Sequence, residues 1–132
     1  MNKQLTALLV MPQERRSRLL THLTDLDATI LTAASCGEAA RLLRDEPGVR
    51  LVLTDLSLPD GSWFDVLSRV GDARHDAKVV VCAHLADERL WTQVLEAGGF
   101  DVLVEPYQDR EVHRILCAAA SGYMPPRLAV AS

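Results

Sequence analysis

The sequence is poor in lysine, and its basic charge comes almost entirely from arginine. Only Lys3 and Lys78 are lysines among the 14 basic residues, and the other 12 are arginines. Acidic residues outnumber basic ones by 18 to 14, and a net negative chain lacks the basic surface that nucleic-acid binding usually needs. The composition therefore predicts that the protein does not bind nucleic acid.

Paired cysteines and long hydrophobic runs are also missing. The three cysteines are Cys36, Cys82 and Cys117, and no two of them have CxxC spacing. This pattern disfavours a disulfide framework or a zinc knuckle and favours a reducing, cytoplasmic location. Uncharged apolar stretches such as residues 5–12 and 79–86 are too short to span a membrane. The first of them has no small-residue cleavage site after it, so no signal peptide is expected.

The length and the overall balance predict one globular domain. Two domains in 132 residues would each fall near the lower size limit. Apolar residues make up 48% and charged residues 24% of the chain, which is ordinary for a globular protein. We expect the domain to cover residues 1–124 and residues 125–132, which begin with two prolines, to form a C-terminal tail.

Short apolar runs alternate with segments of helical periodicity along the whole chain. The runs cover residues 5–10, 28–32, 50–54, 78–82 and 101–104. Three of them are almost continuously hydrophobic, as strands covered by helices on both faces should be. Between them, apolar residues recur at helical spacing, as they do in Trp63, Val66, Leu67 and Val70. The pattern predicts five βα units.

Five βα units predict an α/β fold with a doubly wound parallel sheet between two layers of helices, a flavodoxin-like three-layer sandwich. The common order of five such strands is 2-1-3-4-5. Functional groups then gather at the carboxyl ends of the strands, near strands 1 and 3. The residues to examine are Met11, Pro12, Asp55, Cys82 and Glu105.

Asp55 is the most informative of these residues. It directly follows the run of residues 51–54 and precedes a Pro-Asp-Gly turn that includes Asp60. Its position alone fits a functional carboxylate and a loop or helix cap equally well. We expect Asp60 to stabilise its own turn and Trp63 to pack beneath the loop after Asp55.

Several motifs together resemble the response-regulator receiver family. They are Leu-Thr-Asp-Leu-Ser-Leu-Pro-Asp-Gly at 53–61, Ala-Gly-Gly at 97–99 and Glu-Pro-Tyr at 105–107, set within five βα units over residues 4–122. The resemblance implies a receiver domain of two-component phosphorelay signalling, in which Asp55 would accept a phosphoryl group.

The resemblance also implies a metal site. In the family, Mg²⁺ is held by an acidic pair after the first strand, by the phosphoacceptor and by a main-chain carbonyl, which here belongs to Ser57. A Ser or Thr after the fourth strand and a Lys after the fifth strand bind phosphoryl oxygens. Mg²⁺ suits such a site because it takes few carboxylates and keeps several waters.

This sequence lacks three of these supporting parts. Met11 and Pro12 replace the acidic pair, Cys82 replaces the Ser or Thr, and Glu105 replaces the Lys. At about 4 Å and an effective dielectric near 20, one charge pair contributes roughly 4 kcal/mol, so Glu105 turns an attraction into a similar repulsion. We therefore expect a pseudo-receiver that signals through protein–protein contacts and is not an enzyme. The Mg²⁺ that the resemblance implies is less expected here, because the acidic pair is replaced.

Two forms of compensation remain open. Asp55, Glu105 and Glu14 could form a rearranged acidic cluster that binds a divalent cation, and a partner kinase would then phosphorylate Asp55 as in a conventional response regulator. Alternatively, Arg15 or Arg16 could neutralise a buried Asp55, which otherwise must raise its pKa.

A flavin- or nucleotide-binding protein on the same fold is a different class of function. Such a site needs a loop rich in Ser, Thr or Gly after the first strand. Here that loop is Met-Pro-Gln-Glu-Arg-Arg at residues 11–16, which has no glycine and contains a proline without an N–H. The same sequence shows no nucleophile–base pair of a hydrolase. Neither alternative is favoured.

The resemblance implies partners as well. They would be a sensor histidine kinase or other signalling proteins, and a second copy of the chain could bind at the face formed by residues 90–95, 101–104 and 112–119. Val102 stands where many receivers carry a switching aromatic residue, so we expect no aromatic switch. His84, in the loop after residues 78–82, is expected to be solvent-exposed and without a role.

Overall fold

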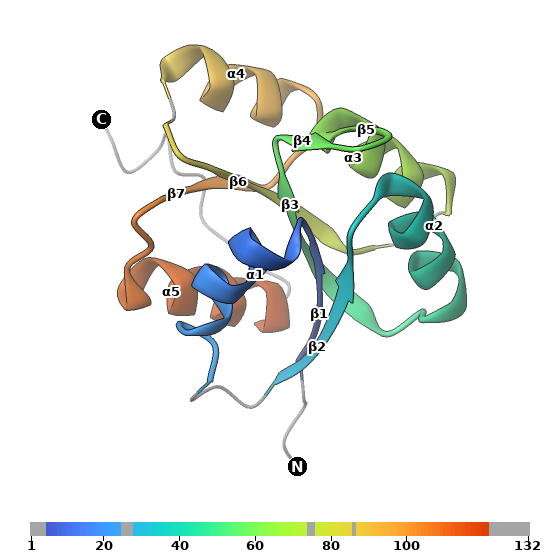
Figure 1. Ribbon diagram of the computed structural model, residues 1–132, viewed down its shortest axis with the longest axis horizontal. Helices are drawn as coiled ribbons and strands as arrows, with labels where there is room; N and C mark the ends of the chain where they lie inside the picture. The colour runs from blue at the N-terminus through green and yellow to red at the C-terminus, as the bar shows by residue number, and fades with distance from the viewer. Residues whose placement is uncertain (1–4, 25–27, 74–75, 86, 122–132) are drawn as a thin grey trace.

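The computed structural model describes residues 5–24, 28–73, 76–85 and 87–121 (Figure 1). In chain order the elements are β1 (Leu5–Val10), α1 (Gln13–Leu20), β2 (Ala28–Ala33), α2 (Cys36–Asp45), β3 (Val49–Asp55), β4 (Ser57–Leu58), β5 (Gly61–Ser62), α3 (Trp63–Asp72), β6 (Lys78–Ala83), α4 (Glu88–Glu96), β7 (Asp101–Val104) and α5 (Asp109–Ser121). The predicted tail at 125–132 and the domain end at residue 124 lie outside the described residues. Within the described ranges, no helix is long and apolar enough to cross a membrane.

The main sheet confirms the predicted topology. Its five strands are parallel and lie in the order β2-β1-β3-β6-β7. Strands β4 and β5 form a separate antiparallel hairpin, so the order of the five main strands is 2-1-3-4-5, as expected. The predicted runs at Leu5–Val10 and Asp101–Val104 have the bounds of β1 and β7.

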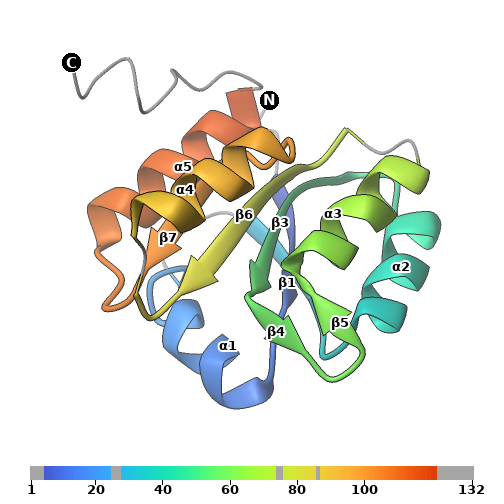
Figure 2. The same ribbon diagram turned by 90° about the horizontal axis from the view of Figure 1, so that it is seen from above.

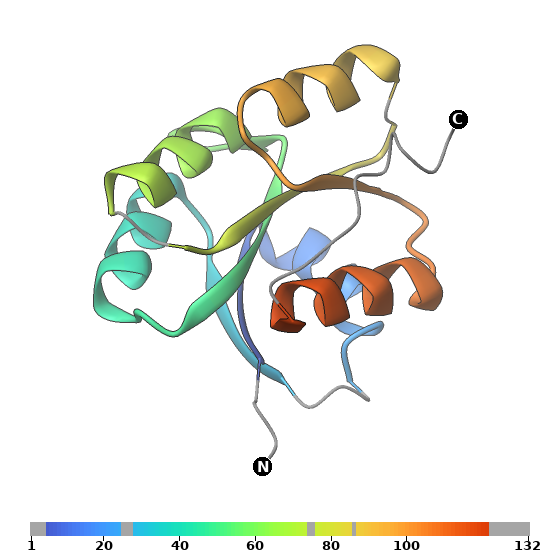
Figure 3. The same cartoon turned by 180° about the vertical axis from the view of Figure 1, so that it is seen from behind.

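Helices cover both faces of the sheet, which explains why its strands are apolar on both sides. In β1, Ala7 and Leu9 belong to the core on the α1 and α5 face, whereas Leu8 and Val10 belong to the core beneath α2 and α3. Figure 2 shows α2 and α3 together on one side of the strands. Figure 3 shows β6 and β7 running between α4 and α5. The predicted three-layer sandwich is confirmed.

The loop after β3 is fixed by contacts on both sides of its hairpin. The N–H of Trp63 donates to the carbonyl of Leu56 at 3.2 Å. Trp63 and Leu56 both pack against the buried cluster around Val81 and Val102. Ser62 caps α3, and its backbone N–H donates to Asp65 Oδ2 at 2.9 Å in a capping box.

Asp60 has a role beyond the one predicted within its own turn. Its two carboxylate oxygens accept from the backbone N–H groups of Cys36, at 2.7 Å, and of Gly37, at 3.0 Å. These are the first residues of α2, so Asp60 caps a helix that begins 24 residues earlier in the chain. The hydrogen bonds from the helix lower the pKa of Asp60 below its usual value. The cap joins the hairpin that follows Asp55 to the neighbouring helix.

Candidate functional site

The strand ends bring the predicted site residues to one edge of the sheet. Asp55 ends β3 and is paired in register with Cys82 of β6, which in turn is paired with Leu103 of β7. Glu105 follows β7 directly. Asp55 is one of few buried polar side chains among the described residues, at 8% exposed. A carboxylate at this depth needs hydrogen bonds or a cation.

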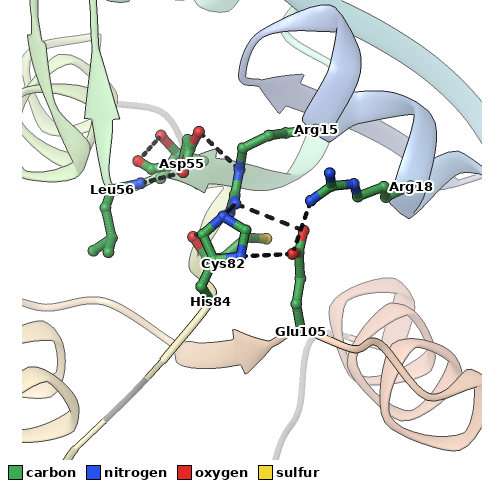
Figure 4. Close-up of polar contacts among 8 residues, drawn as sticks. Arg15, Arg18, Asp55, Leu56, Cys82, His84 and Glu105 are labelled. Carbon is green, nitrogen blue, oxygen red and sulfur yellow. Dashed lines mark hydrogen bonds and ion pairs between the residues drawn. The ribbon is translucent and has the colours of Figure 1, made fainter.

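Asp55 receives both kinds of partner. Its Oδ1 accepts a hydrogen bond from the backbone N–H of Leu56 at 2.8 Å, and its Oδ2 lies 3.0 Å from Nε of Arg15. The contact with Arg15 is an ion pair rather than a well-aligned hydrogen bond, because Nε has no hydrogen-bond partner. Of the two arginines proposed as neutralising partners, the structure selects Arg15 (Figure 4).

The rest of the Arg15 guanidinium faces the neighbouring strand ends. Nη1 lies 3.7 Å from Glu105 Oε2 and also contacts Nε2 of His84, while Nη2 donates to the carbonyl of Cys82 at 3.4 Å. The Arg15 side chain is only 11% exposed. Figure 4 shows it extending from α1 between Asp55 and Glu105. One cation from α1 therefore links the ends of β3, β6 and β7.

Glu105 is held by three groups in addition to its backbone. Its Oε1 lies 3.3 Å from Nη1 of Arg18 and 2.9 Å from Nδ1 of His84, and its Oε2 faces Arg15. His84 therefore donates from Nδ1 to Glu105 and accepts at Nε2 from Arg15, which assigns the neutral tautomer with hydrogen on Nδ1. The two arginines and the two carboxylates then balance in charge.

The remaining predicted positions supply little chemistry. Met11 is fully buried in the apolar core, and Pro12 is the N-cap of α1 without a side-chain hydrogen bond. Cys82 is fully buried, and burial raises the pKa of its thiol to about 12, so the thiol stays protonated at neutral pH. Its contribution to the site is the backbone carbonyl rather than the side chain.

The rearranged acidic cluster does not form. Glu14 is exposed on α1, and Arg15 lies between the carboxylates of Asp55 and Glu105. Among the described residues, no three His, Cys, Asp or Glu side chains are grouped so that they could hold a metal ion. Ser57, proposed as a carbonyl donor, begins β4 and is exposed. The residues present do not fit Mg²⁺.

Two residues of the cluster were not identified from the sequence. His84 is 63% exposed, as expected of a loop histidine, but both of its ring nitrogens have partners in the cluster. Arg18 lies three residues after Arg15, on the same side of α1, and this spacing was the available signal. This spacing indicates a role for Arg18 only when Glu105 is known to lie opposite α1.

A model of the response regulator receiver domain family matches residues 13–116. The chain belongs to this family. The receiver is 30% identical over 89 residues to the two-component response regulator ORR11 of Oryza sativa subsp. indica, a match that covers 64% of this chain and 60% of the rice protein. The match therefore spans about three fifths of that relative.

Solved receiver domains share the fold of this receiver. The receiver domain of the sensor histidine kinase PA1611 from Pseudomonas aeruginosa, solved with a coordinated magnesium ion, has a TM-score of 0.77 at 20% identity, covering 90% of this chain and 99% of that chain. The receiver domain of Ssk1 from Saccharomyces cerevisiae, solved with the phosphotransfer protein Ypd1, has a TM-score of 0.76 at 17% identity, covering 91% and 94%.

Membership places this chain among the receiver domains of two-component signalling. Receivers generally bind Mg²⁺ in the active-site cleft and interact with histidine kinases or phosphotransfer proteins. This receiver keeps the aspartate at the end of β3, but an arginine of its own is paired with that carboxylate.

Proposed function

We propose that this receiver signals through protein–protein contacts that do not require phosphorylation of Asp55. The observation that carries the proposal is the Arg15 guanidinium, which lies 3.0 Å from Asp55 and 3.7 Å from Glu105. A phosphoryl donor would have to displace this guanidinium from the Asp55 carboxylate before the carboxylate could attack.

The charges around Asp55 also oppose the product. A phosphoryl group adds negative charge, and Glu105 stands at the position where the family has a lysine. A unit charge pair at about 4 Å contributes roughly 4 kcal/mol at an effective dielectric near 20, which corresponds to about three orders of magnitude in an equilibrium constant. Arg18 and His84 offset part of this repulsion, because both contact Glu105.

The proposal also names a class of partner and the surface to which the partner would bind. The partner would be a sensor histidine kinase or another signalling protein of the cytoplasm, or a second copy of the chain, and the binding surface would be the face of α4, β7 and α5. A shallow cavity of about 210 Å³ lies there and is lined in part by Trp91, Val104 and Glu111. Val102, at the position of the family's switching aromatic residue, is buried beneath this face.

One alternative remains within the same class. Asp55 is present and 8% exposed, so a partner kinase could phosphorylate it as in a conventional regulator, with Arg15 serving as the cation for the phosphoryl group. In this alternative, phosphorylation of Asp55 needs no metal ion. Measuring phosphorylation with and without Mg²⁺ therefore tests it directly.

The test is phosphorylation by a small-molecule acyl phosphate, with and without Mg²⁺, followed by intact-protein mass spectrometry. We expect no phosphorylated wild-type protein under either condition. A restored variant, with Met11→Asp, Pro12→Asp, Arg15→Ala and Glu105→Lys, should gain Mg²⁺-dependent phosphorylation that Asp55→Asn abolishes. Circular dichroism would establish that the restored variant is folded.

The two outcomes that oppose the proposal differ from each other. Wild-type phosphorylation without Mg²⁺ that is lost in Asp55→Asn would support the kinase alternative with Arg15 as the cation. Wild-type phosphorylation that depends on Mg²⁺ would mean that the substituted positions do not impair the site, and it would overturn the electrostatic argument.

A further inference from the structure

We infer that the Arg15 guanidinium is the resident cation of this site and that it permanently neutralises carboxylates that a metal ion would otherwise neutralise. The inference concerns what holds the carboxyl edge of the sheet together, and it does not depend on how the domain signals. If Arg15 has this role, the stability of the carboxyl edge of the sheet does not depend on divalent cations.

The contacts of Arg15 are those of an enclosed cation. Its three nitrogens face four acceptors: Oδ2 of Asp55 at 3.0 Å, Oε2 of Glu105 at 3.7 Å, the carbonyl of Cys82 at 3.4 Å and Nε2 of His84. Carboxylate, carbonyl and imidazole groups are also the usual ligands of first-row metal ions. The donor set thus has the chemistry of a cation site, with a guanidinium inside it.

The carboxylates need this cation because they are shielded from water. The Asp55 and Glu105 side chains are 12% and 11% exposed. Oε2 of Glu105 is buried and accepts no hydrogen bond, so the guanidinium of Arg15 is the cation that it faces. Removing a single partner from a buried ion pair is costly because an uncompensated charge remains. Without Arg15, Asp55 would have no cation beside it, and Glu105 would keep only the contacts of its Oε1 with Arg18 and His84.

Arg15 also excludes a competing ion. A divalent cation at Asp55 would meet the positive charge of Arg15 and would find the carboxylate oxygens already paired. If Arg15 is truncated to alanine, Asp55, Glu105 and His84 keep their positions on separate strand ends but lose their common partner. A cavity of about 440 Å³, lined by Glu105 and His84 among others, lies on the Glu105 side of the cluster.

The first part of the test is thermal unfolding of Arg15→Ala, Arg15→Lys and a control, Arg16→Ala. Arg16 is the next residue of α1, and no ion pair is found for it within the described part of the chain. Arg15→Ala should melt about 10 °C below the wild type, as expected for loss of one partner of a buried ion pair. Arg16→Ala should melt close to the wild type.

Chemical rescue separates the cation from ordinary packing. Methylguanidinium in the millimolar range should raise the melting temperature of Arg15→Ala and leave that of Arg16→Ala unchanged, with equal concentrations of sodium and urea as controls. Arg15→Lys should melt above Arg15→Ala because it keeps the charge. If Arg15→Ala does not fold, recovery of its circular dichroism on addition of methylguanidinium replaces the melting shift as the readout.

The second part measures Mn²⁺ binding by electron paramagnetic resonance, with no phosphoryl compound present. The described side chains are not grouped to hold a metal ion, so we expect weak Mn²⁺ binding in both proteins. Arg15→Ala should nevertheless bind Mn²⁺ at least about tenfold more tightly than the wild type, since a repelling charge has been removed. Adding Asp55→Asn to Arg15→Ala should weaken that binding again. The readout is independent of phosphorylation, so the proposed function can fail while this inference stands.

Clear results would overturn the inference. Equal melting temperatures of Arg15→Ala and Arg16→Ala would mean that the Arg15 guanidinium does not stabilise the fold. Equal stabilities of Arg15→Lys and Arg15→Ala, without rescue by methylguanidinium, would mean that the side-chain packing matters and the charge does not. Mn²⁺ binding by the wild type that matches that of Arg15→Ala would show that Arg15 excludes no ion.

Discussion

Two aspartate–arginine pairs lie on different strands of the sheet and have similar local geometry. Asp55 ends β3, whereas Asp101 begins β7 and is level with Leu53, two residues before Asp55. At the carboxyl end of β3, Oδ1 of Asp55 accepts from the next residue's N–H at 2.8 Å, and Oδ2 lies 3.0 Å from Arg15. At the beginning of β7, Oδ1 of Asp101 accepts from the N–H of Val102 at 2.8 Å, and Oδ2 lies 2.9 Å from Arg114. Both carboxylates are buried.

The surroundings of the two arginines differ. Arg114 lies on α5 with its side chain 37% exposed, and it also pairs with Glu111, three residues earlier on the same helix. The Arg15 side chain is 11% exposed and reaches Glu105 from a different part of the chain. Arg114 thus joins one helix to one strand, whereas Arg15 joins α1 to three strand ends.

The comparison shows that an aspartate–arginine pair does not by itself identify a functional site. Burying a carboxylate in a sheet calls for a backbone donor and a cation, and the Asp101 pair meets this need at the beginning of β7 rather than at the carboxyl ends of the strands. What distinguishes Asp55 is a second buried carboxylate, Glu105, that shares its cation. In this receiver the aspartate that ends β3 is paired with an arginine that also faces Glu105.

The largest predicted effect comes from removing each arginine in turn. Arg15→Ala leaves two buried carboxylates without their shared cation and should cost about 4 kcal/mol of unfolding free energy. Arg114→Ala should cost about 2 kcal/mol, because Arg114 is partly screened by solvent. Urea unfolding at neutral pH measures both values. A larger loss for Arg114→Ala than for Arg15→Ala would remove the distinction between the two pairs.

A smaller effect is predicted for Asp60, a carboxylate that is paired with backbone N–H groups instead of an arginine. Its pKa is lowered by the N–H groups of Cys36 and Gly37, so the charged form stabilises the fold above the unfolded-state pKa, near 4. This stabilisation is lost as the pH falls through the folded-state pKa.

The corresponding measurement compares melting temperatures of the wild type and Asp60→Asn between pH 6 and pH 2.5, which lie about two units above and about 1.4 units below the ordinary aspartate pKa. At pH 6 the wild type should have a higher melting temperature than Asp60→Asn. The difference between the two melting temperatures should shrink as the pH falls. A difference that stays constant across this range would mean that the charge of Asp60 does not stabilise α2.

Most of the fold followed from local features of the sequence. The five main strands are short apolar runs, three of them almost continuous, and a parallel βα repeat restricts their order. The caps at Ser35 and Ser62 were predictable because each acts within its own helix end. The β4–β5 hairpin was expected only as a turn, since strands of two residues leave no periodic pattern.

The site was less predictable because its contacts join distant parts of the chain. Arg15 and Arg16 are equivalent in the sequence, and the start of α1 at Gln13 decides which of them faces the strand ends, because successive helical residues point about 100° apart. His84 and Glu105 meet across two loops, and Asp60 reaches α2 across 24 residues. No spacing in the sequence reports such contacts.

The most direct test of the account is an NMR spectrum of the ¹⁵N-labelled wild-type protein, recorded before and after addition of Mg²⁺ and beryllofluoride, a phosphoryl mimic. The reporters are the Leu56 amide, which donates to Asp55, and Nε–H of Arg15, assigned by its loss in Arg15→Lys. The account predicts that neither signal moves. A saturable shift of both signals, absent in Asp55→Asn, would show that Asp55 exchanges Arg15 for the phosphoryl mimic, and it would contradict the account.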